Sequence, residues 1–187
     1  MPIDESYPRP YKFTNAQFDQ LGDMGWFEGR RPILLDGMIL EQGPMSPLHA
    51  CGLGLVYESL RSIFATGWVI RPQFPLHLSE FNDPVPDIAV VKGEIRDFRE
   101  HPKTAPFIIE VSDSTLDFDM TRKKKWYAEA GIADYWILDL IGRRLLVYRD
   151  PDPATSTYRS QQAFGSADHV SPLAAPPASI LVADLLP

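Results

Sequence analysis

Residues 107–140, FIIEVSDSTLDFDMTRKKKWYAEAGIADYWILDL, carry the strongest indication of the fold class. It opens with a continuous apolar run, FIIEV (107–111), which predicts a central strand covered on both faces. A helix is expected over about 119–130, because Gly131 suits the position just after a helix C-terminus. The run YWILDL (135–140) predicts a second strand. Strand, helix and strand then form a βαβ unit, whose right-handed crossover makes the two strands parallel.

Clear local signals flank this unit. Thr14 and Gln17 have the spacing of a capping box, which predicts a helix starting there. In ILLDGMILE (33–41) two apolar runs surround an Asp-Gly pair, which is typical of a hairpin with a type I′ turn. The pair Ser46-Pro47 predicts the N-terminus of a long core helix that ends before Gly67. The chain therefore starts with a helix and a hairpin, followed by a long helix.

Two further runs, PDIAVV (86–91) and RLLVYRD (144–150), predict more strands. Antiparallel partners beside a parallel pair give an α/β fold with a mixed β-sheet flanked by helices. We expect a single domain over residues 1–187. Proline-rich stretches indicate a flexible arm at 1–10 and a C-terminal extension at 150–187.

The composition restricts the environment and the partners. The N-terminus has no apolar segment typical of a signal peptide, and no apolar run is long enough to span a membrane, so cytoplasmic residence without a membrane is expected. The single cysteine, Cys51, excludes an internal disulfide framework. A net charge of −7 is unusual for a protein that binds nucleic acid. The positive charge is gathered in short clusters, at 30–31, 122–125 and 143–144.

Three residues form the candidate active site: Asp87, Glu110 and Lys123. Asp87 begins a predicted strand, and Glu110 interrupts an apolar one. A carboxylate buried in such a strand must be paired, bind a metal or become neutral. Lys123 lies on the helix that packs back over the strand of Glu110. Two carboxylates can hold a hard divalent cation, Mg²⁺ or Mn²⁺, and a lysine can stabilise the charge that develops on a phosphate.

These motifs resemble a known family. PDIAVV, FIIEVSDST and the run D-x-x-x-K-x-x-x-Y-x-x-x-G-I-x-D-Y-W-I-L-D are similar to the Uma-type restriction endonucleases, bacterial members of the PD-(D/E)xK nuclease superfamily. Similarity extends to RPYKFTNAQF, LLDGMILEQGPMSPLH and SPLAAPPASILVADLL, and so covers nearly the whole chain. The resemblance implies a restriction-endonuclease-like core. It also implies that Asp87 and Glu110 are the metal carboxylates.

The chain departs from the superfamily pattern at two places. Ser112 stands where the superfamily motif has its lysine, and the family pattern places the lysine on the following helix, at Lys123. Asp119, Lys123 and Tyr127 are spaced four residues apart and share one helix face.

The second departure is in the hairpin. Family members often have Glu directly after Asp-Gly, where this chain has Met38. Glu41, three positions later, falls on the opposite face of an extended strand. Its role as a third acid therefore stays open. His49 matches a histidine common after the hairpin and is an accessory candidate, although a histidine at a helix start is more often a surface or capping residue.

Three functions compete. The first is a metal-dependent endodeoxyribonuclease, expected to be a homodimer with DNA favoured as its substrate; specificity would come from the tail, from loops such as 92–104 or from a partner. The second is a weak or inactive nuclease-fold module that binds nucleic acid or a protein, consistent with Met38 and the acidic charge. The third is a glycosidase that uses Asp87 and Glu110 directly. The alternative to a metal-binding role for Glu110 is a structural ion pair with Lys123 or a nearby arginine. The alternative to a catalytic role for Lys123, which lies in the run RKKK, is a solvent-exposed position on the helix surface.

Overall fold

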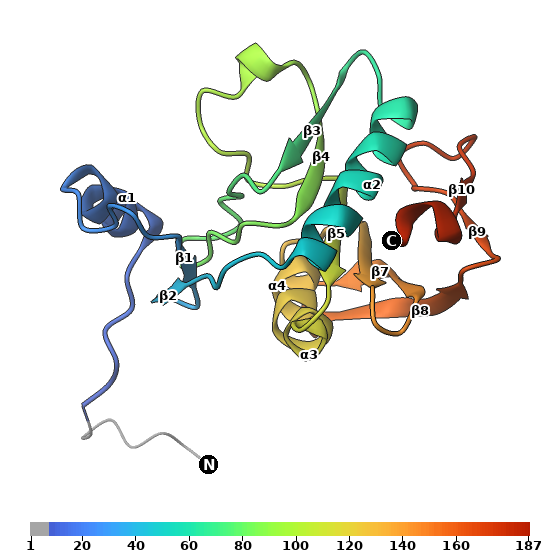
Figure 1. The fold of residues 1–187 in the computed structure, drawn as a ribbon. Coiled ribbons are helices and arrows are strands. Elements are labelled where there is room, and N and C mark those ends of the chain that lie inside the picture. The colour runs from blue at the N-terminus through green and yellow to red at the C-terminus, as the bar shows by residue number, and fades with distance from the viewer. Residues whose placement is uncertain (1–7) are drawn as a thin grey trace.

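The computed structural model describes residues 8–187, so the expected flexible arm at 1–10 lies mostly outside the described residues. A six-stranded sheet forms the centre of the domain (Figure 1), in the order β3-β4-β5-β6-β7-β8. Its strands β5 and β6 are parallel, and all other neighbours are antiparallel. The mixed α/β sheet and its parallel βαβ unit are thus confirmed. The bounds are β3 Trp68–Pro72, β4 Ile88–Lys92, β5 Phe107–Ser112, β6 Asp134–Asp139, β7 Arg144–Asp152 and β8 Thr157–Gly165.

Helices cover both faces of the sheet. The long helix α2 (Pro47–Ile63) and the C-terminal 3-10 helix η3 (Val182–Leu185) pack on one face, where Phe107, Ile109 and Val111 of β5 meet them. The other face meets the crossover helix, which packs against Ile108. Because successive side chains of a strand point to opposite faces, Glu110 shares the face of Ile108. All six residues of β5 are buried, as expected for a strand covered on both sides.

The crossover helix differs from its prediction. It begins at Leu116, three residues before the predicted start at Asp119, and has three parts: α3 (Leu116–Phe118), the π-helical turn η2 (Asp119–Lys123) and α4 (Lys124–Glu129). In the described part of the chain no side chain caps its start, so the sequence carries no local capping signal for that boundary. A π turn takes in an extra residue and is frequent at functional sites. The C-terminal end agrees with the prediction, with Gly131 at φ 69°.

The N-terminal elements form as expected. Helix α1 (Asn15–Asp23) begins with the predicted capping box of Thr14 and Gln17. Strands β1 (Pro32–Leu35) and β2 (Met38–Glu41) form a separate hairpin, whose turn has Asp36 at φ 52° and Gly37 at φ 76°. The hairpin packs on α4 through Trp126, whose indole N–H donates to Asp36 Oδ1 at 3.0 Å. Helix α2 has the predicted N-cap, Ser46.

The C-terminal part belongs to the same layers. The expected boundary at residue 150 falls inside β7, and β8 extends the main sheet. The short strands β9 (His169–Val170) and β10 (Ile180–Leu181) pair with each other, and the chain then enters η3 on the core. The loop 92–104 carries one 3-10 turn, η1 (Ile95–Asp97). Among the described residues, no helix is long and apolar enough to cross a membrane.

Candidate active site

The crossover helix brings Lys123 to Glu110. The two side chains form an ion pair with Nζ 2.9 Å from Oε2, and the Glu110 side chain is fully buried. One turn earlier, Asp119 Oδ1 lies 2.9 Å from the same ammonium. One turn later, the Tyr127 hydroxyl donates to Glu110 Oε1 at 2.6 Å. The predicted helix face of Asp119, Lys123 and Tyr127 therefore covers the strand position of Glu110.

Ser112, the residue at the superfamily's lysine position, serves the same cluster. It shares a face of β5 with Glu110, two residues away, and its hydroxyl donates to Asp119 Oδ2. Thr115 donates to that oxygen as well, at 2.8 Å. A serine here thus fixes the carboxylate that in turn holds Lys123. The amine reaches Glu110 from the helix, which explains how the site keeps a lysine without one on the strand.

Asp87 enters the site from the segment before β4. Its backbone N–H donates to Glu110 Oε2 at 3.1 Å, and the N–H of Val111 donates to Asp87 Oδ2 at 2.8 Å. These two bonds cross-link the start of β4 to β5 and bring both predicted metal carboxylates together. Asp87, Glu110 and Lys123 therefore meet at one place, although they are 36 residues apart at most in the sequence.

The electrostatics of this cluster reflect its burial. Burial raises the pKa of Glu110 to about 8, although the charge of Lys123 opposes the rise. Burial alone would lower the pKa of Lys123, but Glu110, Asp119 and Asp87 together raise it above its ordinary value, so the amine stays charged. Burial would likewise raise the pKa of Asp87, yet the hydrogen bond from His49 and the charge of Lys123 lower it. Asp87 is thus the ionised carboxylate of the pair.

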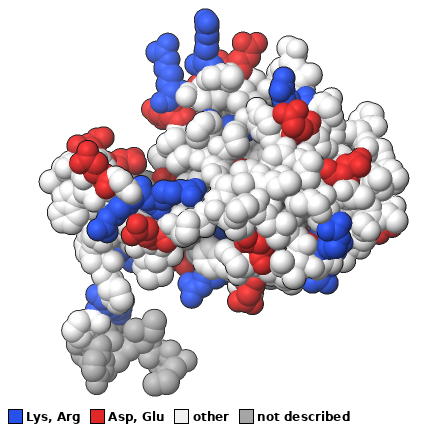
Figure 2. All heavy atoms as spheres, in the orientation of Figure 1, with Lys and Arg blue, Asp and Glu red and all other residues white. Residues whose placement is uncertain are grey.

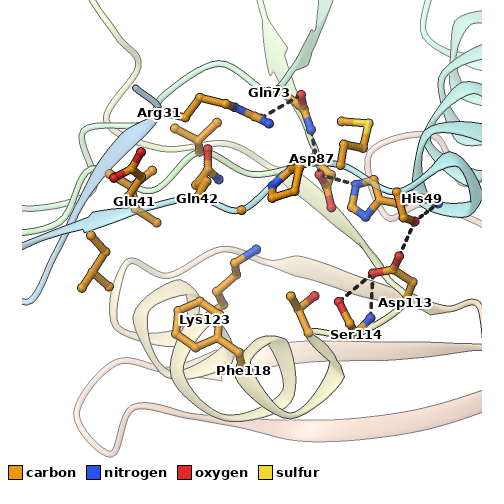
Figure 3. A pocket seen from close by; sticks show the side chains of 18 residues that line it. Arg31, Glu41, Gln42, His49, Gln73, Asp87, Asp113, Ser114, Phe118 and Lys123 are labelled. Atoms are coloured by element: carbon orange, nitrogen blue, oxygen red, sulfur yellow. Dashed lines mark hydrogen bonds and ion pairs between the residues drawn. The ribbon is translucent and has the colours of Figure 1, made fainter. Parts of the chain in front are cut away.

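A cavity of about 370 Å³ opens beside the cluster. Figure 3 shows Lys123 and Asp87 pointing into it from opposite walls. Glu41, at the end of β2, lies on its rim, with a side chain that is 59% exposed and an ion pair to Arg30 at 3.8 Å. Met38 lines a separate depression between the hairpin and the crossover helix. Met38 and Glu41 therefore line different depressions, and Glu41 is the acidic residue of β2 that lines the cavity beside the cluster.

His49 belongs to the site rather than to the open surface. Its Nε2 lies 3.0 Å from Asp87 Oδ1, and its side chain is 15% exposed. The hydrogen bond with Asp87 is the main cause that raises the pKa of His49 above its ordinary value. The N-cap Ser46 fixes the first turn of α2 and also donates to Asp113, a further carboxylate that lines the cavity.

Sequence reasoning missed Gln73. Its amide Nε2 donates to Asp87 Oδ1 at 3.2 Å, and its backbone N–H donates to the carbonyl oxygen of Asp87. Gln73 has φ 51°, which is uncommon for a residue other than glycine. Its amide also accepts from Arg31 at 3.4 Å. Neither Gln73 nor Arg31 lies in a motif, so only their place in the fold connects them to the site.

The donor set suits a hard divalent cation. Three carboxyl groups are buried here, those of Asp87, Glu110 and Asp119, and Lys123 pairs with the last two while His49 pairs with Asp87. Their oxygen atoms are the kind of ligand that a hard divalent cation prefers. Within the described residues, no third Asp, Glu or His brings a ligand atom close enough to form a three-ligand group with Asp87 and Glu110. Mg²⁺ is commonly bound in this way, by one or two carboxylates together with water and substrate phosphate oxygens.

The surface charge around the site is mixed. On the face drawn in Figure 2, basic and acidic side chains are interspersed among uncharged ones, without one broad basic surface. Near the cavity the basic groups are Arg31 and Lys123, and the acidic ones include Glu41, Asp87 and Asp113. This distribution agrees with the net charge of −7. Around the cavity, a polyanion could contact Arg31 and Lys123 but would not meet a continuous basic surface.

Comparisons with known proteins agree with this geometry. Residues 16–183 match a family model, Uma2, described as "Putative restriction endonuclease". No curated protein matches the chain. Among solved structures, it is similar to a crystal structure of a putative nuclease belonging to DUF820 from Anabaena variabilis ATCC 29413, with a TM-score of 0.72 and 16% identity over 92% of this chain and 97% of that one. At this identity the likeness concerns the fold, and it supports the expected nuclease-like core.

Proposed function

Because the chain belongs to the Uma2 family, whose description is putative restriction endonuclease, we propose that it is a divalent-metal-dependent endonuclease that hydrolyses phosphodiester bonds in DNA. The observation that carries the proposal is the meeting of Asp87, Glu110 and Lys123 beside one open cavity. Hydrolysis of a phosphodiester needs an activated water and a positive group near the phosphate. The cluster offers residues for both.

In this proposal Asp87 and Glu110 hold Mg²⁺ or Mn²⁺. The cation, when bound, polarises a phosphoryl oxygen and lowers the pKa of a coordinated water. Lys123 is the catalytic amine, since it lines the cavity and stays protonated among its carboxylates. Its charge would stabilise the negative charge that builds on the phosphate.

The remaining residues are positioning residues. His49 and Gln73 both hold Oδ1 of Asp87, which fixes the direction of that carboxylate. Tyr127 holds Glu110, and Asp119 holds Lys123. Glu41 on the rim could meet the substrate or a water that coordinates the cation. A homodimer would place two such sites on one duplex, and we include that assembly in the proposal.

Two observations favour the second hypothesis, a weak or inactive module that binds nucleic acid or a protein. The Glu110 side chain is fully buried and does not line the cavity, and the net charge is −7. The glycosidase hypothesis has less support. It needs Glu110 to give its proton to a sugar oxygen, and the buried carboxyl group is instead engaged by Lys123 and Tyr127.

The test is cleavage of supercoiled plasmid by the purified chain in Mg²⁺ or Mn²⁺, with EDTA as the metal-free arm. We expect nicking that disappears in EDTA and falls by at least about a hundredfold in Lys123→Met, the size of loss typical for one charge-stabilising group. The matched control is Lys125→Met, which removes an amine of the same run that is 61% exposed and, among residues 8–187, pairs only with Glu129. It should cleave like the unmodified chain.

Other outcomes separate the alternatives. Binding of Mn²⁺, abolished by Asp87→Asn, without cleavage of plasmid, single-stranded DNA or RNA would support the inactive module. Cleavage that persists in Lys123→Met or in EDTA would refute the proposed site. Light scattering of the purified chain, with and without a DNA duplex, measures its mass and tests the homodimer.

A further inference from the structure

A second group of metal-ligating side chains lies outside the proposed active site. Asp19, His77 and Asp83 each bring one ligand atom within 4.8 Å of the others. Asp19 comes from α1, and His77 and Asp83 come from the connection between β3 and β4. No other group of three such residues comes this close among the described residues. Asp19 is thus distant in the sequence from the other two, which lie in one connection.

Two of the three side chains lack the partners that buried polar atoms normally have. Asp83 is 3% exposed, and its Oδ1 is buried without a hydrogen-bond partner among the described residues. His77 Nε2 is buried without a hydrogen bond as well, and lies 3.4 Å from Asp83 Oδ2. Most buried polar atoms in proteins are satisfied, so an unpaired carboxylate oxygen beside an imidazole nitrogen without a hydrogen bond requires an explanation. A cation between them would satisfy both.

The charge balance favours the same explanation. Within residues 8–187, no ion pair joins the carboxyl group of Asp19 or of Asp83 to a lysine or an arginine, and the one ion-pair partner of Asp83 is His77. An uncompensated carboxylate in such a place is costly. Arg71 and His101 line the same depression as Asp19 and His77. Because Nη2 of the positively charged Arg71 lies 3.4 Å from Nδ1 of His101, we leave His101 out of the ligand set.

We propose that Asp19, His77 and Asp83 form a second metal site, distinct from the nuclease centre, which binds a borderline divalent cation of the Zn²⁺ class. Two carboxylates and one imidazole are ligands that Zn²⁺ accepts, whereas Mg²⁺ prefers oxygen alone. Asp19 is exposed, so a water would complete the coordination on that side. The site does not depend on the proposed nuclease activity.

The consequence of such a site is structural. Helix α1 lies at the periphery of the molecule (Figure 1) and has no buried residue. Its N-terminus is held by Asn15, which donates from its backbone to Glu80 and from its side chain to Ser79, both at 2.8 Å. Beyond this point a depression of about 1120 Å³ separates α1 from the body. A cation on Asp19 would clamp the middle of the helix across that depression.

The same clamp would reach the hairpin. The backbone N–H of Asp83 donates to the carbonyl oxygen of Leu34 in β1 at 2.8 Å. Asp83 is therefore bonded to the element that carries Glu41 to the rim of the cavity. Binding of Zn²⁺ is expected to order α1 and to stabilise the junction of the hairpin with the sheet. The effect is measurable without any enzymatic assay.

The experiment is calorimetric titration of Zn²⁺ into the EDTA-treated full chain, carried out in an Asp87→Asn background to remove the nuclease centre. We expect one site, weakened by at least about tenfold in Asp19→Asn and in His77→Gln, since even indirect changes around a metal cost that much. Asp23→Asn, an exposed acid on the same helix, is the matched control and should bind like its parent. Hydrogen exchange of the α1 amides should slow with Zn²⁺ in the parent and stay unchanged in Asp19→Asn.

Three results would overturn the proposal. One is the absence of Zn²⁺ binding in the Asp87→Asn background. Another is equal binding in Asp19→Asn and its parent. The third is a loss in Asp23→Asn as large as in Asp19→Asn, which would indicate diffuse attraction to an acidic helix. Asp19 and Asp23 are exposed, so these variants keep the fold, and their circular dichroism spectra verify it.

Discussion

Replacing Lys123 by methionine tests the electrostatics of the cluster directly. Methionine keeps most of the length of the lysine side chain and removes the charge that faces Glu110 and Asp119, each at 2.9 Å. The Lys123 side chain is 15% exposed and both carboxylates are essentially buried, so solvent screens this interaction little. Removing one partner of a buried ion pair costs about 3–5 kcal/mol of unfolding free energy. For a domain of this size, that is a fall in melting temperature of roughly 6–20 °C.

The loss of unfolding free energy in Lys123→Met should depend on pH. The pKa of Glu110 is raised from 4.5 to about 8 in the folded chain. The folded state therefore binds the proton more tightly, and this stabilisation is complete below pH 4.5 and disappears as the pH rises through 8. Lys123 opposes that rise, so its removal raises the pKa of Glu110 further. The deficit of Lys123→Met should consequently be larger at pH 8 than at pH 5.

The assay is urea unfolding in EDTA, followed by tryptophan fluorescence at both pH values. Lys125→Met serves as the control and should change stability by less than about 0.5 kcal/mol, because its ion pair is exposed. A Lys123→Met variant that is as stable as the parent at pH 8 would refute the reasoning. So would a deficit that is equal at pH 5 and pH 8.

Three further predictions concern the residues around this cluster. Tyr127→Phe removes the hydroxyl that donates to Glu110 Oε1, so urea unfolding should show a loss of about 1–3 kcal/mol, and an unchanged midpoint would contradict that bond. Gln73→Gly relieves φ 51° but removes a donor to Asp87; it should be more stable than Gln73→Ala by about 1 kcal/mol, and the prediction fails if calorimetry ranks the two the other way. Asp87 raises the pKa of His49 in the folded chain. The pair therefore stabilises the fold fully below the pKa of His49 in the unfolded chain, and the stabilisation is lost as the pH rises through its pKa in the folded chain. The difference in unfolding free energy between the parent and His49→Gln should decrease from pH 6 to pH 9, and a constant difference would exclude this dependence on the protonation of His49.

Local chemistry made much of the fold predictable. The capping box at Thr14, the Asp-Gly turn and the Ser46-Pro47 start each satisfy backbone groups within a few residues, so their signals are complete in the sequence. The candidate site was predicted from the family resemblance and from two periodicities. Alternation along β5 puts Glu110 on one face, and the four-residue spacing of the crossover helix brings Lys123 and Tyr127 to it.

Other features had no local signal. Within residues 8–187, the start of the crossover helix at Leu116 lacks a side-chain cap, and the helix contains a π turn over Asp119–Lys123 that was not predicted. The contact of His49 with Asp87 spans 38 positions and is set by how α2 lies over the sheet. Gln73 reaches Asp87 through an uncommon backbone conformation that nothing in its neighbours requires.

The sequence alone predicted the elements up to about residue 150 and the parallel βαβ unit, because hydrophobic periodicity and capping act over short distances. Together with the family resemblance, it also gave Asp87, Glu110 and Lys123 as the candidate site residues. Only the tertiary structure decided which oxygen each donor meets, that Glu41 and not position 38 faces the cavity, and that Asp19 lies within reach of His77 and Asp83. Such contacts arise from the packing of whole elements. That packing minimises exposed apolar area over the entire domain, so no short stretch of residues encodes it.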